Sequence, residues 1–319
     1  MPLVLVTRPV PQQAYDLLSG HAEVDRNDED RQLEPAELLD RLRGCDGVLC
    51  TLGDRLDAAT LEAAAPTLRV IANFAVGVDN IDLDAAQRLG MTVTNTPDVL
   101  TDATAEIAVG LMLATARRFA SGDRMVREGR FDGWAPLLHR GHDVYGKRVG
   151  IIGAGRIGHR VAATMRHGFG CSILYHSRTA RPDWESTLDA RRAPLDDLLQ
   201  RCDIVSIHCP LTPETHHLID ARRLALMAPH AVLINTARGA VIDEAALVDA
   251  LREERIAGAG LDVFENEPAL APGLATLDNV VLLPHIGSAT HETRTTMAEL
   301  AAQSIIDLLS GKQPKHRVV

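Results

Sequence analysis

A run of apolar residues that breaks into three closely spaced glycines places the strongest constraint on what this chain can fold into. Residues 149–158 read VGIIGAGRIG, with glycines at 153, 155 and 158, and a helix-like pattern continues to Met165. The first glycine permits a tight turn, the second lets a pyrophosphate approach the backbone, and the third lets a helix pack closely on the strand. The start of that helix offers N–H groups and a positive dipole end to phosphates. The pattern therefore predicts a dinucleotide-binding turn.

Strand and helix patterns alternate through both halves of the chain. The first hundred residues contain the apolar runs LVLVT, GVLC, RVIAN and MTVTN, and the second half contains RVGIIG, CSILYH, DIVSIH, AVLINT, AGAGLD and VVLLP. Such alternation is typical of a parallel sheet with helices on both faces. A chain of 319 residues also exceeds the usual size of one core. We therefore predict an α/β fold of two doubly wound parallel-sheet domains, both Rossmann-like.

Two helical patterns set the expected domain boundaries. One runs from about Thr101 to Arg118 and should bridge the domains, and the other spans about residues 289–309. The second sheet does not need the last helix, so we expect it to return to the first domain. The predicted domains are a discontinuous, flavodoxin-like substrate-binding domain of residues 1–98 and 286–319, and a nucleotide-binding Rossmann domain of residues 99–285.

Composition limits the compartment and the class of partner. The 33 basic and 43 acidic residues give a net charge of −10, which disfavours binding to nucleic acid or an anionic membrane. No apolar run reaches the roughly 18 residues that cross a bilayer, and the N-terminus has no secretory leader pattern. The five cysteines lack C-x-x-C spacing, which favours reduced thiols. We therefore expect a cytoplasmic protein. We also expect no metal site, because histidines such as His216 and His217 show no supporting carboxylate cluster.

The end of the strand after the glycine turn bears on which nucleotide binds. In a Rossmann unit an Asp or Glu about 20 residues past the glycines usually holds the adenosine 2′-OH. Here the strand ends in His176, Ser177, Arg178 and Thr179. A hydroxyl beside a guanidinium suits a 2′-phosphate, because Arg pairs bidentately with phosphate oxygens. The sequence therefore favours NADPH over NADH, and His176 in place of the acid leaves the use of both cofactors open.

Three segments in the second half carry charged side chains at predicted strand ends, where open α/β sheets bind ligands. They read INTARGAVID at 234–243, LDVFENEP at 261–268 and LLPHIGSAT at 282–290. Earlier motifs are NFAVGVDNIDLDAA at 73–86, TNTPDVLTDATAE at 94–106, DVYGKRVGIIGAGRIG at 143–158 and YHSRT at 175–179. With these motifs, in this order and over nearly its whole length, the chain resembles the D-2-hydroxyacid dehydrogenase family, most closely its glyoxylate and hydroxypyruvate reductase branch.

The resemblance implies a catalytic set of Arg238, Glu267 and His285. Reduction of a 2-keto acid requires a hydride on the carbonyl carbon, a proton on its oxygen and an anchor for the carboxylate. Histidine is the natural proton donor near neutral pH. Glu267 would orient the His285 ring and favour imidazolium, and Arg238 would clamp the carboxylate and polarise the ketone.

The resemblance also implies how substrate is held. The turn at Val76 and Gly77 resembles the family loop whose backbone N–H groups bind the substrate carboxylate, with Asn73 and Asp79 bracing it. Related reductases dimerise through the region after the interdomain helix, which implies a homodimer. Trp134 in this region is expected to line the pocket of the neighbouring subunit, and a position in the core is its alternative.

The remaining implied contacts are with the cofactor. They come from the glycine turn, from the end of the following strand and from later strand ends: Thr104, Gly153, Ala154, Gly155, Arg156, Ile157, Gly158, Ser177, Arg178, Thr179, Thr236, Ala237, Asp262 and Gly287. The resemblance places Asp262 near the nicotinamide carboxamide.

The expected activity is therefore NADPH-dependent reduction of glyoxylate or hydroxypyruvate. Two alternatives stay open at this point. The same cofactor machinery would serve a related dehydrogenase acting on a bulkier 2-keto acid, phosphohydroxypyruvate or phosphite. The fold also occurs in nucleotide-sensing corepressors, although a pure sensor needs no proton donor.

Overall fold

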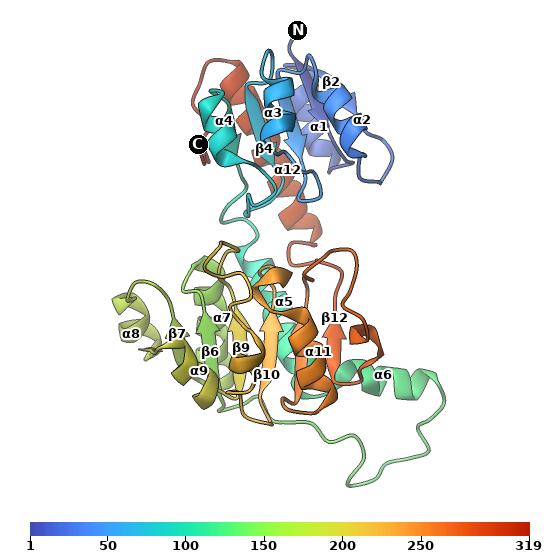
Figure 1. Cartoon of the computed structure of the whole chain (residues 1–319), viewed down its shortest axis with the longest axis vertical. Coiled ribbons are helices and arrows are strands. Elements are labelled where there is room, and N and C mark those ends of the chain that lie inside the picture. The colour runs from blue at the N-terminus through green and yellow to red at the C-terminus, as the bar shows by residue number, and fades with distance from the viewer. The chain divides into compact units, whose positions relative to one another are not determined.

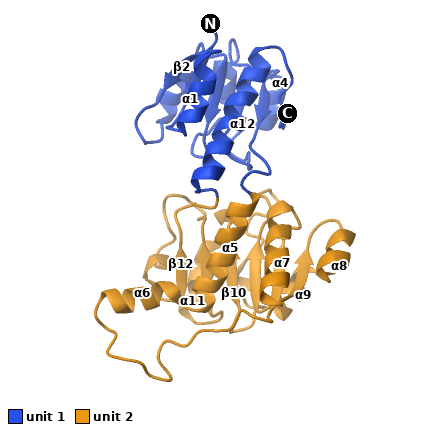
Figure 2. Cartoon of the chain, turned by 180° about the vertical axis from the view of Figure 1, so that it is seen from behind, with its two compact units in different colours: residues 1–100, 288–319 blue, residues 101–287 orange.

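The computed structural model describes residues 1–319, which form two compact units. Unit 1 comprises residues 1–100 and 288–319, and unit 2 comprises residues 101–287 (Figure 2). Unit 1 therefore contains both ends of the chain. The boundaries expected from the sequence, after residues 98 and 285, lie two residues from these.

Unit 1 is a five-stranded parallel sheet in the order β2-β1-β3-β4-β5 (Figure 1). Its strands are β1 (Leu3–Val6), β2 (Glu23–Arg26), β3 (Gly47–Cys50), β4 (Val70–Asn73) and β5 (Thr92–Thr94). Its helices are α1 (Gln12–Ser19), α2 (Pro35–Leu42), α3 (Ala58–Ala64), α4 (Leu83–Arg88) and α12 (His291–Leu309). This strand order is that of flavodoxin-like sheets, which bind ligands at the carboxyl ends of their strands.

Helices cover both faces of the unit 1 sheet. The central strands β3 and β4 are therefore buried along their whole length. Leu18 of α1 and Ile305 of α12 share one core with Val4 and Val6 of β1. A second core joins Leu38 of α2 and Leu61 of α3 to the sheet. The polar strand β2, EVDR, lies at the sheet edge with its side chains partly or fully exposed, and apolar periodicity does not predict it.

Unit 2 is a seven-stranded parallel sheet in the order β12-β11-β10-β9-β6-β7-β8. Its strands are β6 (Arg148–Ile152), β7 (Ser172–His176), β8 (Arg191–Arg192), β9 (Ile204–Ile207), β10 (Val232–Asn235), β11 (Gly258–Leu261) and β12 (Val280–Leu282). Its helices are α5 (Thr101–Ala116), α6 (Phe119–Arg127), α7 (Arg156–Phe169), α8 (Pro182–Leu188), α9 (Leu195–Arg201), α10 (Ala221–Leu224) and α11 (Glu244–Arg252). The predicted fold class of two parallel α/β domains is confirmed. The sequence predicts six strands here and misses β8, which has only two residues.

Helix α5 lies wholly within unit 2, where it packs against α7, β10 and β11. The helix predicted over residues 101–118 ends at Ala116, and Arg118 adopts a left-handed conformation with φ of +57° before α6 begins. Buried α5 residues such as Leu111 and Met112 join Val161 and Met165 of α7 in one core. Together, α5 and α7 fix the sheet edge from which the nucleotide-binding turn and the later strand-end loops emerge.

No helix of the chain is both long and apolar enough to cross a membrane. All five cysteines carry free thiols, and four of them are buried. Burial raises the pKa of Cys45 to about 11 and that of Cys202 to about 12, so these thiols stay protonated and unreactive at neutral pH.

Candidate active site

The turn between β6 and α7 has the shape that a bound pyrophosphate requires. Gly153 has a φ of +102°, and a Cβ there would lie 2.5 Å from the backbone N of Cys209, so a side chain cannot fit. A Cβ on Gly158 would lie 2.3 Å from the Gly153 carbonyl oxygen, which shows how closely α7 packs on the turn. At Gly155, by contrast, a Cβ would meet no heavy atom within 4 Å. The backbone at Gly155 therefore faces open space.

Two further features fit a dinucleotide at this edge of the unit 2 sheet. Helix α7 begins after Gly155 without a side-chain cap, so its first turn can donate N–H groups to an anion. At the end of β10, the hydroxyl of Thr236 is buried and has no hydrogen-bond partner. A buried hydroxyl without a partner calls for a ligand or water to satisfy it.

The loop after β7 carries no carboxylate at the positions where an NAD-binding acid would lie. His176 Nδ1 is 3.1 Å from the Ala193 carbonyl oxygen, and Ser177 Oγ donates to the Thr179 carbonyl at 2.5 Å. The Arg178 side chain is exposed. Hydroxyl and guanidinium groups therefore stand at the strand end, as the sequence predicts.

His285 and Glu267 form a hydrogen-bonded pair at the ends of β12 and β11. His285 Nδ1 lies 2.9 Å from Glu267 Oε2, and Glu267 Oε1 accepts a hydrogen bond from the Phe264 backbone at 3.0 Å. Burial alone would raise the pKa of Glu267, but the hydrogen bond and charge of His285, the Phe264 N–H and the charge of Arg238 outweigh it and lower that pKa. With Nδ1 engaged, Nε2 is the ring atom left for a substrate.

Arg238 follows β10 and approaches this pair because two backbone turns lie in direct contact. Asn235, which is buried, donates to the Arg238 carbonyl at 2.8 Å and accepts from the Ala237 N–H at 3.0 Å. A Cβ on Gly239 would lie 1.8 Å from the Phe264 carbonyl carbon. The turn that carries Arg238 therefore rests on the loop that carries Glu267. Both Asn235 and Gly239 lie within the INTARGAVID motif, but neither is among the site residues predicted from it.

Asp262 holds the loop that carries His285. Its two carboxylate oxygens accept from the backbone N–H groups of Ile286 at 2.7 Å and Gly287 at 2.8 Å. Thr104 of α5 donates to the Gly287 carbonyl at 3.0 Å. Burial raises the pKa of Asp262, and the hydrogen bonds from the Ile286 and Gly287 N–H groups oppose that effect. Asp262, Thr104 and Gly287, which the family resemblance implies as cofactor contacts, are thus braced against one another.

In unit 1, the loop after β4 presents unused backbone donors. Asn73 donates to the Gly77 carbonyl at 2.7 Å, and Asn95 donates to the Val76 carbonyl at 2.8 Å. The N–H groups of Val76 and Gly77 make no hydrogen bond. Two amide side chains therefore fix the carbonyls of this turn and leave its N–H groups for an anion such as a carboxylate.

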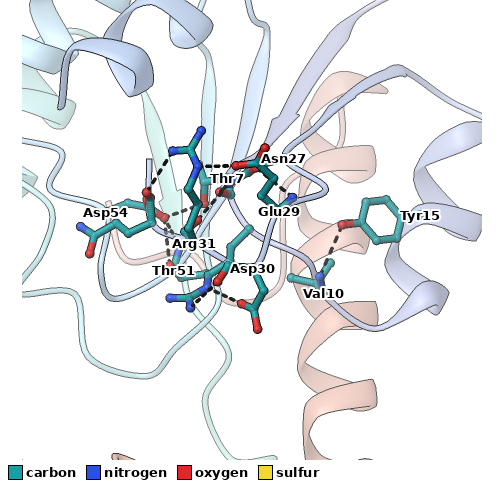
Figure 3. A network of polar contacts seen from close by, with 11 residues as sticks. Thr7, Val10, Tyr15, Asn27, Glu29, Asp30, Arg31, Thr51 and Asp54 are labelled. Atoms are coloured by element: carbon teal, nitrogen blue, oxygen red, sulfur yellow. Dashed lines mark hydrogen bonds and ion pairs between the residues drawn. The ribbon is translucent and has the colours of Figure 1, made fainter. Parts of the chain in front are cut away.

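A buried polar network supports this loop from the neighbouring strand ends. Asp54, which is 2% exposed, accepts from Thr7 Oγ1 at 2.5 Å and from the backbone N of Thr51 at 2.7 Å (Figure 3). Asn80 then donates to the carbonyls of Thr51 and Asp54, both at 3.1 Å, and exchanges hydrogen bonds with the Asn73 amide. The sequence indicates Asn73 as a brace but gives no sign of Asp54 or Asn80.

Trp134 lies in the segment between α6 and β6, residues 128–147, part of which extends away from the body of unit 2 (Figure 2). Its side chain is 84% exposed, so the alternative of a core tryptophan is wrong. Other large apolar side chains in this segment are also exposed, among them Phe131, Leu137 and Tyr145.

The expectation that His216 and His217 lack a neighbouring carboxylate is also wrong. Glu265, far away in the sequence, lies beside them: His217 Nε2 is 2.7 Å from Glu265 Oε1, and the two imidazole rings stack with centroids 4.1 Å apart. The three residues could together hold a metal ion, since their ligand atoms lie within 4.8 Å of one another. Two of these residues, His217 and Glu265, already form a hydrogen bond with each other. His208 Nε2 lies 2.9 Å from Ser206 Oγ, and burial lowers the pKa of this imidazole to about 3.

Comparison with known proteins agrees with this geometry. Residues 109–287 match the family model described as D-isomer specific 2-hydroxyacid dehydrogenase, NAD binding domain. The chain is 49% identical to a glyoxylate reductase of Thermococcus onnurineus, over 98% of this chain and 94% of that protein.

Two solved structures are similar over nearly the full length. A Thermus thermophilus protein superposes with a TM-score of 0.91 at 45% identity, covering 99% of this chain and 100% of that one. The NADPH-dependent glyoxylate/hydroxypyruvate reductase of Sinorhizobium meliloti, solved with NADP and malonate, has a TM-score of 0.89 at 36% identity and covers 100% and 97%. On these matches, the chain belongs to the D-isomer specific 2-hydroxyacid dehydrogenase family.

Proposed function

We propose that this protein is an NADPH-preferring reductase of small 2-keto acids, converting glyoxylate or hydroxypyruvate to the 2-hydroxy acid. The observation that carries the proposal is the pair of His285 Nδ1 and Glu267 Oε2, 2.9 Å apart, with the charge of Arg238 acting on the same carboxylate. A proton donor oriented by a carboxylate, with a cation for an anionic substrate, is what reduction of a 2-keto acid needs.

The proposed roles follow from the chemistry of each group. His285 Nε2 gives its proton to the carbonyl oxygen, while Glu267 holds Nδ1 and stabilises the charged ring. Arg238 pairs with the substrate carboxylate and polarises the carbonyl. Within unit 1, the unused N–H groups of Val76 and Gly77 suit a carboxylate. The reduced nicotinamide, when bound, supplies the hydride.

The cofactor proposal rests on the glycine turn and on the loop after β7. The open backbone at Gly155 and the uncapped start of α7 suit the pyrophosphate. Ala154, Arg156 and Ile157 complete that turn. Ser177, Arg178 and Thr179 suit a 2′-phosphate, and an exposed arginine there is consistent with the NADP-bound relative. Thr236 and Ala237 adjoin the nicotinamide side in this proposal, with Asp262 holding the nearby loop.

We further propose that the enzyme is a cytoplasmic homodimer and that a second copy covers the apolar loop of residues 128–147. Exposed apolar side chains such as Trp134 and Tyr145 mark an interaction surface. In the dimer Trp134 lines the partner's substrate pocket. Sedimentation should give twice the mass of the chain, and Trp134→Ala should alter substrate range. Unchanged turnover and range would remove Trp134 from the pocket.

The deciding experiment follows the absorbance of reduced nicotinamide with purified protein. NADPH and NADH are each combined with glyoxylate, hydroxypyruvate, pyruvate and phosphohydroxypyruvate. Rapid NADPH loss with glyoxylate or hydroxypyruvate is expected, with slower loss of NADH. Faster turnover of phosphohydroxypyruvate would assign another acid, and cofactor binding without oxidation by any acid would favour a nucleotide sensor.

A further inference from the structure

An arginine from the edge strand holds the loop that follows β7. Arg192 lies in β8, opposite Tyr175 of β7 in the parallel register. Its Nε and Nη2 atoms donate to the Ser177 carbonyl at 3.3 and 2.9 Å, and Nη2 also donates to the Arg178 carbonyl at 2.8 Å. One guanidinium therefore fixes two consecutive carbonyl groups of the segment that carries Ser177 and Arg178.

This arrangement matters because a carbonyl oxygen carries partial negative charge. Two such oxygens beside an incoming phosphate would repel it unless a cation offsets them. The Arg192 guanidinium does so through a planar fork that a lysine cannot reproduce. Its Nη1 group makes no hydrogen bond within the chain, so two more N–H donors remain for an anion.

The carboxylate of Glu214 interacts electrostatically with Arg178. Glu214 accepts from Thr212 Oγ1 at 2.8 Å. That hydrogen bond is the largest cause of the lowered pKa of Glu214. The positive charge of Arg178 also lowers this pKa. The charge of Glu214 therefore offsets part of the positive potential that Arg178 offers to a phosphate.

We propose that Arg192 is a positioning residue for NADPH: it holds the Ser177–Arg178 loop in the form that receives the 2′-phosphate and adds the second positive charge there. The inference rests on the NADPH preference proposed above and names a residue on a different strand as one of its causes. NADH has no 2′-phosphate, so its binding should not depend on Arg192.

The test compares Arg192→Ala with Arg191→Ala. Arg191 is the adjacent residue of β8, is also exposed and loses the same charge when replaced. Steady-state KM values are measured for NADPH and NADH, together with inhibition by adenosine 2′,5′-bisphosphate and by adenosine 5′-monophosphate. For Arg192→Ala we expect KM for NADPH and Ki for the bisphosphate to rise about 10-fold, as for loss of a hydrogen bond to a charged group. kcat, KM for NADH and inhibition by the monophosphate should not change.

The conservative variant separates positioning from bulk charge. Arg192→Lys keeps the charge but loses the fork, so its KM for NADPH should lie between that of Arg192→Ala and that of the unaltered enzyme. A lysine variant equal to the unaltered enzyme would overturn the positioning role. Equal losses for NADPH and NADH, or an Arg192→Ala variant no weaker than Arg191→Ala, would overturn the inference as a whole.

These outcomes differ from failure of the proposed function. If the unaltered enzyme does not prefer NADPH, and Arg178→Ala leaves both cofactors unaffected, the cofactor proposal itself falls. If the enzyme prefers NADPH and Arg178→Ala weakens it selectively, the result for Arg192 decides this inference alone.

Discussion

Gly239 and Phe264 are in backbone contact so close that a Cβ on the glycine would lie 1.8 Å from the Phe264 carbonyl carbon. We predict that Gly239→Ala separates the turn carrying Arg238 from the loop carrying Glu267. Because a displacement of about 1 Å in a catalytic group can cost about 10²-fold in rate, kcat/KM should fall by about that factor. Gly168→Ala in α7 is the matched control, since a Cβ there meets nothing within 4 Å. Normal kinetics for Gly239→Ala would show that this contact is not needed.

His285→Ala should lower kcat by roughly 10²-fold or more, because it removes the proposed proton donor. KM for NADPH should stay nearly constant, since the glycine turn and the loop after β7 are untouched. Single-turnover and steady-state kinetics measure both quantities. Near-normal turnover would remove His285 from that role.

Glu267→Gln keeps a hydrogen-bond acceptor for His285 Nδ1 but removes the negative charge. The lowered pKa of Glu267 means that the carboxylate stays ionised at and below its ordinary titration range. Loss of the negative charge of Glu267 should therefore destabilise the positively charged form of the His285 ring. The falling limb of the plot of kcat/KM against pH should then move to lower pH. The pH profile of each protein tests this. Superimposable profiles would show that the charge of Glu267 does not act on the ring.

Asp262→Asn places an amide where two backbone donors, Ile286 N and Gly287 N, both require an acceptor. An amide accepts through one oxygen only, so one buried N–H loses its partner. We expect a loss of about 1–3 kcal/mol in the free energy of unfolding and a lower kcat, measured by urea unfolding and steady-state kinetics. Unchanged stability would mean that the loop holding His285 needs no anchor at Asp262.

Asp203 supplies a pH-dependent part of the stability of unit 2. Burial alone would raise its pKa, but hydrogen bonds from the side chain and backbone of Arg148 and from His230 Nε2, at 2.8 Å, hold that pKa far below the ordinary range. A carboxyl group whose pKa is lowered by folding stabilises the folded state at pH values above its pKa in the unfolded chain, which is about 3.9. This stabilisation is lost as the pH falls towards the lower pKa of the folded protein.

The corresponding variant is Asp203→Asn. It should be less stable than the unaltered protein by about 2 kcal/mol at pH 7, and the difference should shrink below about pH 4. Urea unfolding at several pH values measures it. A difference that stays constant from neutral pH into the acid range would contradict this account.

The fold could be predicted from the sequence to the extent that its strands are apolar. Buried strands such as β6 and β10 give continuous apolar runs, which periodicity detects. The edge strand β2 is polar and β8 is only Arg191–Arg192, so neither differs in sequence from a loop. Helix α8, PDWESTL, buries only Trp184 and Leu188, and its sequence gives a weak helical signal.

The positions of the candidate site residues at strand ends could be predicted, because single motifs mark them. Arg238, Glu267 and His285 lie at strand ends that the motifs mark. The supporting groups were not predictable, because their partners are remote in the chain: Asn80 reaches Thr51, and Glu265 reaches His217. Only the fold brings such pairs together, and spacing along the chain carries no sign of them.

The residues of the proposed proton transfer and the glycine turn belong to one unit, whereas the Val76–Gly77 loop belongs to the other. Selection can therefore act on them separately. If unit 1 holds the acid as proposed, substitutions around its Asn73–Asn80 framework would change which acid is accepted, while Arg238, Glu267, His285 and their supports stay as they are. A division of this kind lets one catalytic apparatus be inherited unchanged by enzymes with different substrates, and exchanging unit 1 loops is a direct route to new specificities.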